Sequence, residues 1–408
     1  MTQTASEDVG LRSRTDAVVR DRVQRPRVVL VAHGAHDEGG MERVFAELIR
    51  HAHREYEFVV ISSELAPDLV TLVEWRRTRV PLRPAPVRFS LFYVLAGLRL
   101  WRARRTADLV HTCGALVPNR VDLASVHFCH AGFREAVGSR AGDGRPILRR
   151  VNTAVAGGLG LAAERWSFRR GRTRVLGAVS EGVAAEVERG YPGVRVVVTP
   201  NGVDLDRFRP DERARAELRG ARGVNGEELV ALFVGGDWHH KGLGVLLEAL
   251  AAAPGMRLWV VGRGDEAGFK AKAEQLGVAT RVEFMGTQSD VERFYQAADV
   301  LVLPSRYEAF SLVSLEAAAC GLPLVVTPVI GVVELIGDGE AGRIVERSAE
   351  AIAGALTDLA SDSELRSRMG AAARRRASSF TWAASAGTVL SLYRELLPHA
   401  RGAEEVAA

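Results

Sequence analysis

The chain has 408 residues, of which 47% are apolar and 25% charged. This length leaves room for two domains of ordinary size, and the composition argues against wholesale disorder. The formal net charge is only +4, but residues 1–200 hold 31 Lys and Arg against 21 Asp and Glu, whereas residues 201–408 hold 23 against 29. The basic first half favours anionic partners such as lipid headgroups, phosphate or acidic glycan, although an Arg-rich proteome predicts the same bias.

The cysteines and the start of the chain bear on the cellular compartment. Cys113, Cys129 and Cys320 include no pair at metal-ligand spacing, so neither a disulfide framework nor a zinc site is indicated. Residues 1–26 are polar with mixed charge, which predicts a disordered tail and not a secretory signal. Apolar-leaning runs such as Val151–Ala163 are shorter than the ~20 residues of a membrane span. We expect a cytoplasmic protein.

An apolar strand, a glycine-rich loop and a helix open the first half. Arg27–Ala32 is the predicted strand, His33–Gly40 the loop and Met41–His51 the helix. This unit brings backbone close to phosphate or sugar at a helix N-terminus, but it lacks the G-x-G-x-x-G spacing of a dinucleotide site. Further strands are predicted at Glu57–Ser62, Ala107–Thr112, Asp122–His127 and Val175–Ser180.

Two stretches of the first half each have two interpretations. The apolar helix Phe89–Trp101, which arginines follow, either inserts its aromatic residues Phe92, Tyr93 and Trp101 among anionic headgroups or packs on the core. We favour the core-facing interpretation. Residues 131–175 contain ten Arg against three acidic residues. They form either an acceptor or membrane face, with peripheral contact at the inner side of the membrane, or a solvated helical surface.

A turn rich in Pro, Asn and Gly lies where the net charge of the chain changes from positive to negative. Residues 195–204 are a strand that ends in Pro and Asn-Gly, so we place the domain boundary here. The predicted domains are 27–199 and 200–380, with helix 381–397 packed back on the first. Strands of the second half are predicted at Val230–Gly235, Arg257–Gly262, Val282–Gly286, Val300–Pro304 and Pro323–Thr327. Their alternation with helices predicts two doubly wound parallel-sheet α/β domains facing a central cleft.

The stretch Arg306–Pro323 carries two glutamates around a helix start. A helix is predicted over Ser311–Cys320, with Glu308 just before it and Glu316 on it. Eight positions separate these carboxylates by about 12 Å along a helix axis, so they suit two ends of an elongated ligand better than one reacting atom. Free backbone N–H groups at the helix start would face an anion. This pattern fits a nucleotide sugar, and the alternative is an ordinary strand–loop–helix unit with solvated glutamates.

A second loop of the same kind follows the strand at Val230–Gly235. Lys241 lies just before the predicted start of a helix and can neutralise a phosphate. The glycines Gly235, Gly236 and Gly242 let the backbone approach that phosphate. The loop is not a Walker loop, because the spacing differs and no Ser or Thr follows the Lys. The alternative is a plain turn with an exposed Lys.

These motifs come in a familiar order, and no one of them is specific alone. Between about Arg27 and Leu397 the chain resembles the family-4 retaining glycosyltransferases (glycosyl transferases group 1), which have the GT-B fold. The motifs that carry the resemblance are Gly39–Arg43, Pro200–Pro210, Val234–Ala249, Val261–Gly264, Val282–Gly286, Ala298–Ser305, Glu308–Ala317 and Gly331–Glu334. The resemblance implies an acceptor-side first domain and a second domain that binds a nucleotide-sugar donor.

The resemblance also implies a role for each matching residue. Glu316 would hold the ribose, Glu308 the donor sugar, and Lys241 would balance the charge of the diphosphate. His127 matches the active-site histidine that contacts the donor sugar, although His130 is an alternative match. The remaining implied donor contacts are the backbone near Ala309, Phe310, Ser311 and Leu312 at the diphosphate, Met285 at the base, Gly235 and Gly236 at the phosphate loop, and Gly39 and Gly40 from the first domain.

One position departs from the family. Gly236 stands where the family usually has an Arg, so the phosphate charge would rest on Lys241 with help from His239, His240 or Arg306, or else donor affinity is low.

The predicted function is front-face retaining transfer to a hydroxyl of a cell-envelope lipid, glycan or small molecule. We expect no metal, no other cofactor and no nucleic-acid partner. A non-catalytic nucleotide-sugar-binding protein and an epimerase or phosphorylase of the same fold remain as alternatives.

Overall fold

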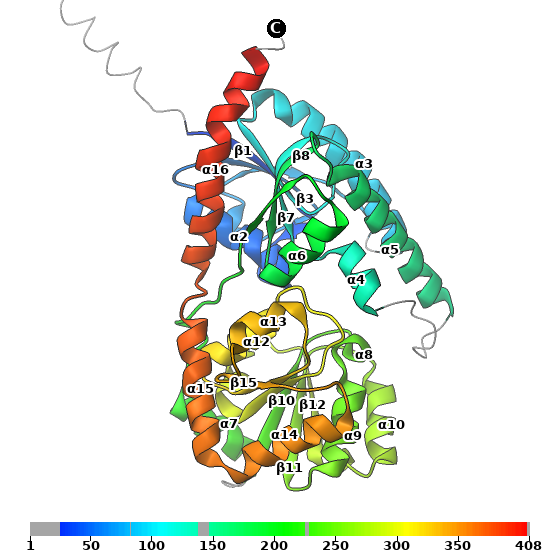
Figure 1. Ribbon diagram of the computed structural model, residues 1–408, viewed down its shortest axis with the longest axis vertical. Helices are drawn as coiled ribbons and strands as arrows, with labels where there is room; N and C mark the ends of the chain where they lie inside the picture. The colour runs from blue at the N-terminus through cyan, green and yellow to red at the C-terminus, as the bar shows by residue number, and fades with distance from the viewer. Residues whose placement is uncertain (1–24, 82, 138–146, 225–227, 406–408) are drawn as a thin grey trace, which may run out of the picture.

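The computed structural model describes residues 25–81, 83–137, 147–224 and 228–405. The expected disordered tail therefore lies almost entirely outside the described residues. Two parallel sheets, each with its covering helices, follow one another along the long axis, one in each half of the chain (Figure 1). The last two helices of the chain follow one another along one side, the first of them beside the second sheet and the other beside the first sheet. This arrangement confirms the predicted fold class of two doubly wound domains. The domain limits at 199 and 200 stay a prediction.

The strands form two large sheets and one small one, and every recorded strand pair is parallel. The first sheet has the order β5 (Glu74–Arg77), β3 (Glu57–Ser62), β1 (Arg27–Val31), β6 (Leu109–Cys113), β7 (Val121–Val126), β8 (Thr173–Ala178), β9 (Arg195–Val198). The second has the order β12 (Val282–Gly286), β11 (Met256–Val261), β10 (Leu229–Val234), β13 (Val300–Leu303), β14 (Leu324–Val326), β15 (Gly342–Ile344). The third pairs β2 (Gly34–Ala35) with β4 (Glu64–Leu65).

The apolar runs of the sequence became the inner strands, and the strands that the prediction missed are short or at sheet edges. β5 reads Glu-Trp-Arg-Arg and β15 reads Gly-Arg-Ile, so neither carries a continuous apolar run. Charged side chains are common on edge strands because one side of the strand faces no neighbour. Pattern reading alone therefore missed one edge strand of each large sheet, β5 and β15, although it predicted the other two, β9 and β12.

Helices cover the sheets. In the first half these are α2 (Gly40–Ala52), α3 (Ala85–Ala103), α4 (His130–Val137), α5 (Ile147–Ser167) and α6 (Glu181–Gly190). In the second half they are α7 (Glu212–Ala221), α8 (Trp238–Lys241), α9 (Leu243–Ala252), α10 (Glu266–Gln275), α11 (Glu292–Ala297), α12 (Leu312–Ala319), α13 (Ile330–Ile336), α14 (Ala349–Ser361) and α15 (Ser363–Ala377). The last helix is α16 (Trp382–Glu405).

Alternate side chains of the first sheet enter two separate cores. Val29 and Val31 of β1 share one apolar cluster with Phe92 of α3. Val28 and Leu30 share the other with α2 and α16, as expected from the two-residue period of a strand. The second sheet builds its own core from β10 to β14 and their covering helices.

The chain passes between the two sheets at two adjacent places. Val203, after β9, pairs with Thr381, before α16, and its backbone N–H donates to the Phe380 carbonyl at 2.8 Å. Tyr393 of α16 is then fully buried in the same apolar cluster of the first sheet as Val28 and Leu30. Figure 1 shows this last helix rising beside the first sheet.

The structure corrects one interpretation of α3. Phe92 is 0% exposed and packs in the core, so it does not belong to a membrane-inserting face. Trp101, in contrast, is 58% exposed. The inner face of α3 is thus core-facing, as we favoured. Among the described residues, no helix combines the length and apolar character needed to cross a membrane.

In both large sheets the chain adds strands on one side of its first strand and then returns to add strands on the other side. In the first sheet β1 lies beside β6, and in the second β10 lies beside β13. At such switch points the connections leave in opposite directions, which opens a crevice at the carboxyl ends of the strands. The predicted site motifs follow β1, β7, β10 and β13, so they lie at these ends.

Candidate active site

The loop after β10 is shaped by the close approach of Lys241. A Cβ atom on Gly235 would lie 2.6 Å from Cδ of Lys241, so the lysine side chain lies directly over this glycine. Gly242 has φ +87° and faces the Pro304 carbonyl, 2.2 Å from where its Cβ would be. Gly235 also has a positive φ, +141°, so the backbone conformation favours glycine at both positions.

Lys241 and Glu308 form an ion pair. The Nζ atom of Lys241 lies 2.7 Å from Oε1 of Glu308, and both side chains are largely buried. Ser305 Oγ donates to the same carboxylate oxygen, also at 2.7 Å. The structure thus brings together the predicted phosphate cation and the predicted sugar-binding carboxylate, although they lie 67 residues apart in the sequence.

The segment between Glu308 and α12 is fixed on several sides. The Ser311 side chain caps the helix by accepting a hydrogen bond from the Ser314 backbone N–H at 3.2 Å. The Ala309 carbonyl accepts a hydrogen bond from Ser180 Oγ of the first domain at 2.8 Å. Gly331 packs against this backbone, since its Cβ would lie 2.4 Å from the Ala309 carbonyl carbon. These contacts therefore hold the backbone N–H groups of Phe310, Ser311 and Leu312 in fixed positions at the start of α12.

Glu316 contacts two residues that the sequence analysis did not assign to the site. Its Oε1 accepts a hydrogen bond from Arg43 of α2 at 2.7 Å, and its Oε2 accepts one from the Tyr295 hydroxyl at 3.0 Å. The side chain is 7% exposed, and burial raises the pKa of its carboxyl, while Arg43 acts in the opposite direction. Arg43 ends the Gly39–Arg43 motif, which was the available signal for it.

The Gly39–Gly40 loop of the first domain lies against the second. Gly39 has φ +93°, and its Cβ would lie 2.5 Å from a carboxylate oxygen of Glu42. A Cβ on Gly40 would lie 3.3 Å from Cδ1 of Leu312, the first residue of α12. The loop, Arg43 and the start of α12 therefore meet between the two domains.

Gly236 differs from Gly235 because the space around it is open. The nearest atom to an added Cβ is the Arg263 carbonyl oxygen, at an ordinary contact distance of 3.7 Å. The three residues expected to help with phosphate charge are arranged differently from one another. His240 Nε2 lies 3.0 Å from the Tyr307 carbonyl, the ring of His239 packs on Phe269, and Arg306 is exposed.

Met285 lies in β12 at the point where the register with β11 shifts, between Phe284 and Gly286, and it is half-buried. Its carbonyl accepts a hydrogen bond from the Gln288 side-chain amide. The backbone segment expected to read the base is therefore held by its own loop.

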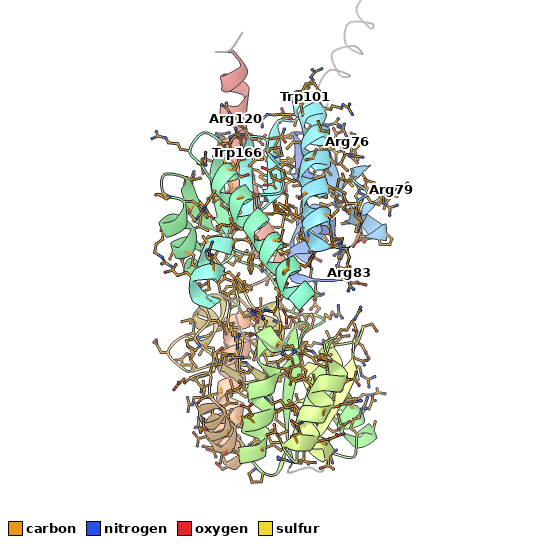
Figure 2. All side chains as sticks on the ribbon, turned by 90° about the vertical axis from the view of Figure 1, so that its right-hand side faces the viewer. Arg76, Arg79, Arg83, Trp101, Arg120 and Trp166 are labelled. Atoms are coloured by element: carbon orange, nitrogen blue, oxygen red, sulfur yellow. The ribbon has the colours of Figure 1, made fainter. Side chains whose placement is uncertain are left out.

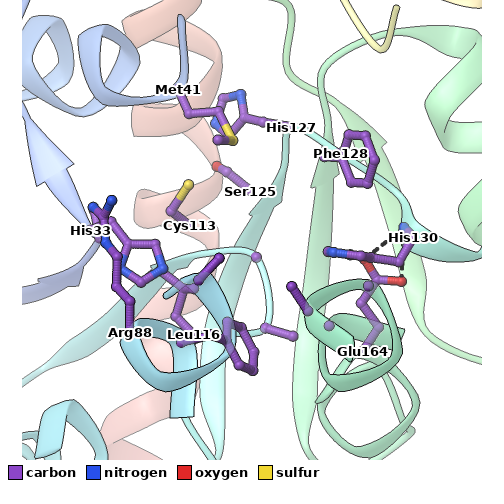
Figure 3. A pocket seen from close by; sticks show the side chains of 18 of the residues that line it. His33, Met41, Arg88, Cys113, Leu116, Ser125, His127, Phe128, His130 and Glu164 are labelled. Carbon is purple, nitrogen blue, oxygen red and sulfur yellow. Dashed lines mark hydrogen bonds and ion pairs between the residues drawn. The ribbon is translucent and has the colours of Figure 1, made fainter. Parts of the chain in front are cut away.

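A cavity of about 530 Å³ lies over the carboxyl ends of the first sheet (Figure 3). Its walls come from the loop after β1, the start of α2, the first turn of α3, the ends of β6 and β7, α4 and the middle of α5. Most lining side chains are apolar. The polar and titratable ones include His33, Glu42, Arg88, Ser125, His127, His130, Thr153 and Glu164.

The two candidate histidines have different surroundings in this cavity. His130 Nδ1 lies 2.7 Å from Oε1 of the buried Glu164, which also accepts a hydrogen bond from the Tyr191 hydroxyl at 2.6 Å. His127 Nε2 has no hydrogen-bond partner among the described residues. Burial lowers the pKa of His127 to about 4, so this ring is neutral at pH 7. Figure 3 shows the His130–Glu164 pair on the far side of the cavity from His33.

His33 was not predicted as a site residue. It follows β1 at the switch point, and burial together with Arg88 lowers its pKa to about 4. Its Nδ1 atom is buried without a hydrogen-bond partner among the described residues. Its position directly after the first buried strand was the signal that pointed to it.

No three His, Cys, Asp or Glu side chains gather as a metal site in the part of the chain that the structure describes.

Comparisons with known proteins agree with this geometry. The model of the glycosyltransferase family 4 matches residues 38–207, and the model of glycosyl transferases group 1 matches residues 214–376. The D-inositol 3-phosphate glycosyltransferase of Segniliparus rotundus is 33% identical over 345 residues, which cover 79% of this chain and 73% of that protein. The match to the enzyme of the same name from Mycobacterium marinum covers only 47% of its length.

Solved structures share the whole architecture. WaaG, a glycosyltransferase involved in lipopolysaccharide biosynthesis, superposes with a TM-score of 0.75 at 25% identity, over 89% of this chain and 98% of that one. The Anabaena protein HepE, solved in complex with UDP-glucose, has a TM-score of 0.68 at 18% identity, over 90% and 99% of the two chains. The likeness to HepE concerns the fold alone. The chain therefore belongs to glycosyltransferase family 4, and it is a glycosyltransferase with the GT-B fold.

Proposed function

We propose that this glycosyltransferase moves a sugar from a nucleotide-diphosphate sugar, such as a UDP-sugar, to a hydroxyl acceptor with retention of anomeric configuration. The observation that carries the proposal is the 2.7 Å Lys241–Glu308 pair beside the start of α12. A cation and a helix N-terminus suit a diphosphate, and the adjacent carboxylate suits sugar hydroxyls. HepE, which shares the fold, was solved with UDP-glucose, and this supports the donor class.

The charge changes of the reaction assign the roles. As the bond between the anomeric carbon and the diphosphate oxygen breaks, negative charge grows on the departing nucleoside diphosphate. Lys241 and the N–H groups at the start of α12 stabilise this charge from fixed positions. Glu316 holds the ribose, so the two carboxylates bind opposite ends of the donor.

The acceptor hydroxyl attacks from the face that the diphosphate leaves. The new bond joins the acceptor oxygen to the anomeric carbon, and the acceptor proton passes to a phosphate oxygen of the leaving group. Neither Glu308 nor Glu316 acts as a nucleophile, unlike the paired carboxylates of retaining glycosidases. The neutral His127 binds a hydroxyl of the donor sugar through Nε2, for which the described residues provide no hydrogen-bond partner.

The acceptor belongs to the cell envelope or is a small molecule. The name of the Segniliparus relative points to a phosphorylated polyol as its own acceptor. In this chain, Arg88 is the one arginine among the cavity's described lining residues, and the remaining walls are mainly apolar. This lining favours an acceptor with an apolar part. We place the enzyme in the cytoplasm, with polysaccharide or envelope-lipid biosynthesis as its context.

A thermal-shift screen with UDP- and GDP-sugars tests the donor class, because a ligand that binds only the native state raises its melting temperature. We expect a UDP- or GDP-sugar to raise the melting temperature of the wild type but not of Glu316→Ala. Glu283→Ala is the control, since Glu283 also lies in the second domain and contacts arginine, but at the opposite end of the sheet. Equal shifts in Glu316→Ala and wild type would remove Glu316 from the donor site.

Transfer assays separate the remaining alternatives. The anomeric configuration of the product, read by NMR, tests retention, and an inverted product would overturn it. Isomerisation of the donor without acceptor would favour an epimerase, and donor binding without single-turnover transfer to any acceptor of a panel would favour a binding protein. EDTA is expected to leave transfer unchanged, because Lys241 replaces a metal ion at the diphosphate.

A further inference from the structure

The outer face of α3 and α5 carries an unusual share of exposed apolar side chains. Thirteen large apolar side chains are exposed among the described residues, and eight of them lie on these two helices. We call this surface the α3/α5 face. Its apolar members are Val87, Leu91, Val94, Leu98 and Trp101 on α3, and Val151, Val155 and Trp166 on α5.

The spacing of these residues places them on one side of each helix. On α3 they recur every three or four positions, which is the period of a single helical stripe. The opposite side of α3 is already used, because Phe92, Ala96 and Leu100 pack in the core. The outer stripe therefore adds apolar surface that the fold itself does not bury, and α3 and α5 pack side by side.

Arginines surround this stripe, and acidic residues are missing from it. Residues 76–107 contain nine Arg and no Asp or Glu. The only acidic residue of α5 is Glu164, which is buried against His130. Figure 2 shows this face turned toward the viewer, with Arg79 and Arg83 along one side of it, and with Arg76, which pairs with Glu74 of β5 at 2.7 Å, on the same side.

Two tryptophans mark the end of the face that lies away from the second domain. The Arg105 guanidinium lies 5.1 Å from the ring centre of Trp101, and that of Arg172 lies 3.9 Å from the ring centre of Trp166. In Figure 2 both tryptophans lie at the upper end, and Arg83 lies near the second domain. Amphipathic rings with adjacent cations suit the headgroup region of a bilayer.

The cavity of the candidate active site lies between the same two helices. α3 contributes Ala85, Arg88 and Phe89 to its wall, and α5 contributes residues between Thr153 and Glu164. A surface that covers α3 and α5 would therefore lie next to the mostly apolar wall of this cavity.

We propose that the α3/α5 face docks on an anionic lipid bilayer. The apolar stripe enters the boundary between headgroups and acyl chains, and the surrounding arginines bind the acidic headgroups. Docking in this orientation brings the cavity to the membrane surface. If the proposed transfer reaction holds, the acceptor hydroxyl is supplied by a lipid of that bilayer.

The charge of this face favours an anionic bilayer as the binding partner over a second copy of the chain. A two-fold pairing of this face would bring two arginine-rich surfaces together. α3 has no acidic residue and the one acidic residue of α5 is buried, so the helices offer no acidic partner, and like-charge contacts oppose association. An anionic membrane offers the complementary charge over the whole face.

Vesicle co-sedimentation tests the proposal without any transfer assay, so its failure is distinct from failure of the proposed function. The probes are vesicles of phosphatidylcholine alone and of equal parts phosphatidylcholine and phosphatidylglycerol. We expect binding to the anionic vesicles only, and binding that weakens with salt. Because each cation near such a surface contributes about 1 kcal/mol, Arg79→Glu with Arg83→Glu is expected to weaken binding at least ~10-fold.

A pair of exposed apolar substitutions tests the stripe itself. Leu98→Ser with Trp101→Ser is expected to weaken binding by a similar factor. Val333→Ser with Ile344→Ser, two apolar residues of the second domain that are also exposed (44% and 39%), is expected to leave binding unchanged. Absence of binding to anionic vesicles, or equal binding by both pairs, would overturn the proposal. Sedimentation velocity provides a further test. If the wild type is a dimer and the Leu98→Ser, Trp101→Ser variant is a monomer, the face is a protein interface and the proposal is overturned.

Discussion

The two sides of the candidate active site hold their polar groups in opposite ways. On the second-domain side, charges are paired: Lys241 with Glu308, and Glu316 with Arg43 from across the domain interface. On the first-domain side, the cavity is mainly apolar. His33 and His127 are neutral at pH 7, and one ring nitrogen of each has no hydrogen-bond partner within the described part of the chain. Paired charges fix geometry in advance for a charged donor, whereas a neutral apolar cavity selects by shape and by single hydrogen bonds.

The strongest test of the charged side is Lys241→Ala. If Lys241 stabilises the departing diphosphate, kcat should fall on the order of 1,000-fold, because a preorganised charge at the developing anion is lost. Lys272→Ala is the matched control, since Lys272 also pairs with a glutamate in the second domain, at 2.6 Å from Glu248. Transfer of labelled sugar measures both variants, and equal rates would remove Lys241 from the reaction.

Filling the cavity tests the apolar side. Gly157 and Gly158 are neighbours on α5, and an added Cβ meets no atom within 4 Å at either. Only Gly157 lines the cavity. Gly157→Leu is therefore expected to lower transfer by about 100-fold through loss of acceptor positioning, while Gly158→Leu keeps the wild-type rate. A steady-state assay that finds the two variants alike would show that the acceptor does not use this cavity.

A buried histidine should make stability depend on pH. His111 is held by Tyr393 and Ser125, and burial lowers its pKa to about 3. An unfolded histidine titrates near 6.5, so below this pH the unfolded chain binds a proton that the folded chain does not. Its contribution is complete above pH 6.5 and is lost as the pH falls, by about 2 kcal/mol at pH 5.

Urea unfolding of the wild type and of His111→Gln measures this effect. The variant is expected to be less stable at pH 7 but to lose less stability between pH 7 and pH 5. Between pH 7 and pH 8 the two curves should run parallel. If both proteins lose the same free energy of unfolding on acidification, His111 is not the group responsible.

Alanine substitutions of the two candidate histidines should have different effects on kcat/KM and on the melting temperature. His127→Ala removes one neutral hydrogen bond to the donor sugar, which corresponds to about a 10-fold loss of kcat/KM. His130→Ala leaves the buried Glu164 without its histidine partner and should mainly lower the melting temperature. The reverse pattern, with activity lost in His130→Ala at unchanged melting temperature, would exchange their roles.

The smallest expected effect concerns Gly236. Because the space around it is open, Gly236→Arg is expected to tighten donor binding by about 5-fold through one more partly exposed charge near the phosphates. Gly235→Ala is the contrasting neighbour, since its Cβ would collide with Lys241 and displace it. Isothermal titration with the donor identified in the screen measures both. Weaker donor binding in Gly236→Arg would show that this loop does not face the phosphates.

Much of the fold could be read from local pattern. The apolar runs at Arg27–Ala32 and Val300–Pro304 became the inner strands β1 and β13, because buried parallel strands need continuous apolar sequence. The glycines at 39, 235 and 242 marked positions of positive φ or close approach. The short edge strands β5 and β15 were not predicted, because charged or very short segments carry no continuous apolar run.

The arrangement of charges was decided by the tertiary structure alone. Glu316 and Arg43 lie 273 residues apart, so no spacing rule connects them, and only the meeting of the two domains makes them partners. In the same way, the sequence offered His127 with His130 as an alternative, and only the fold set Glu164 against His130. The sequence by itself determined which residues sit at strand ends, because periodicity is local; which of them share a charge, a cavity or an outer face depended on how distant elements pack.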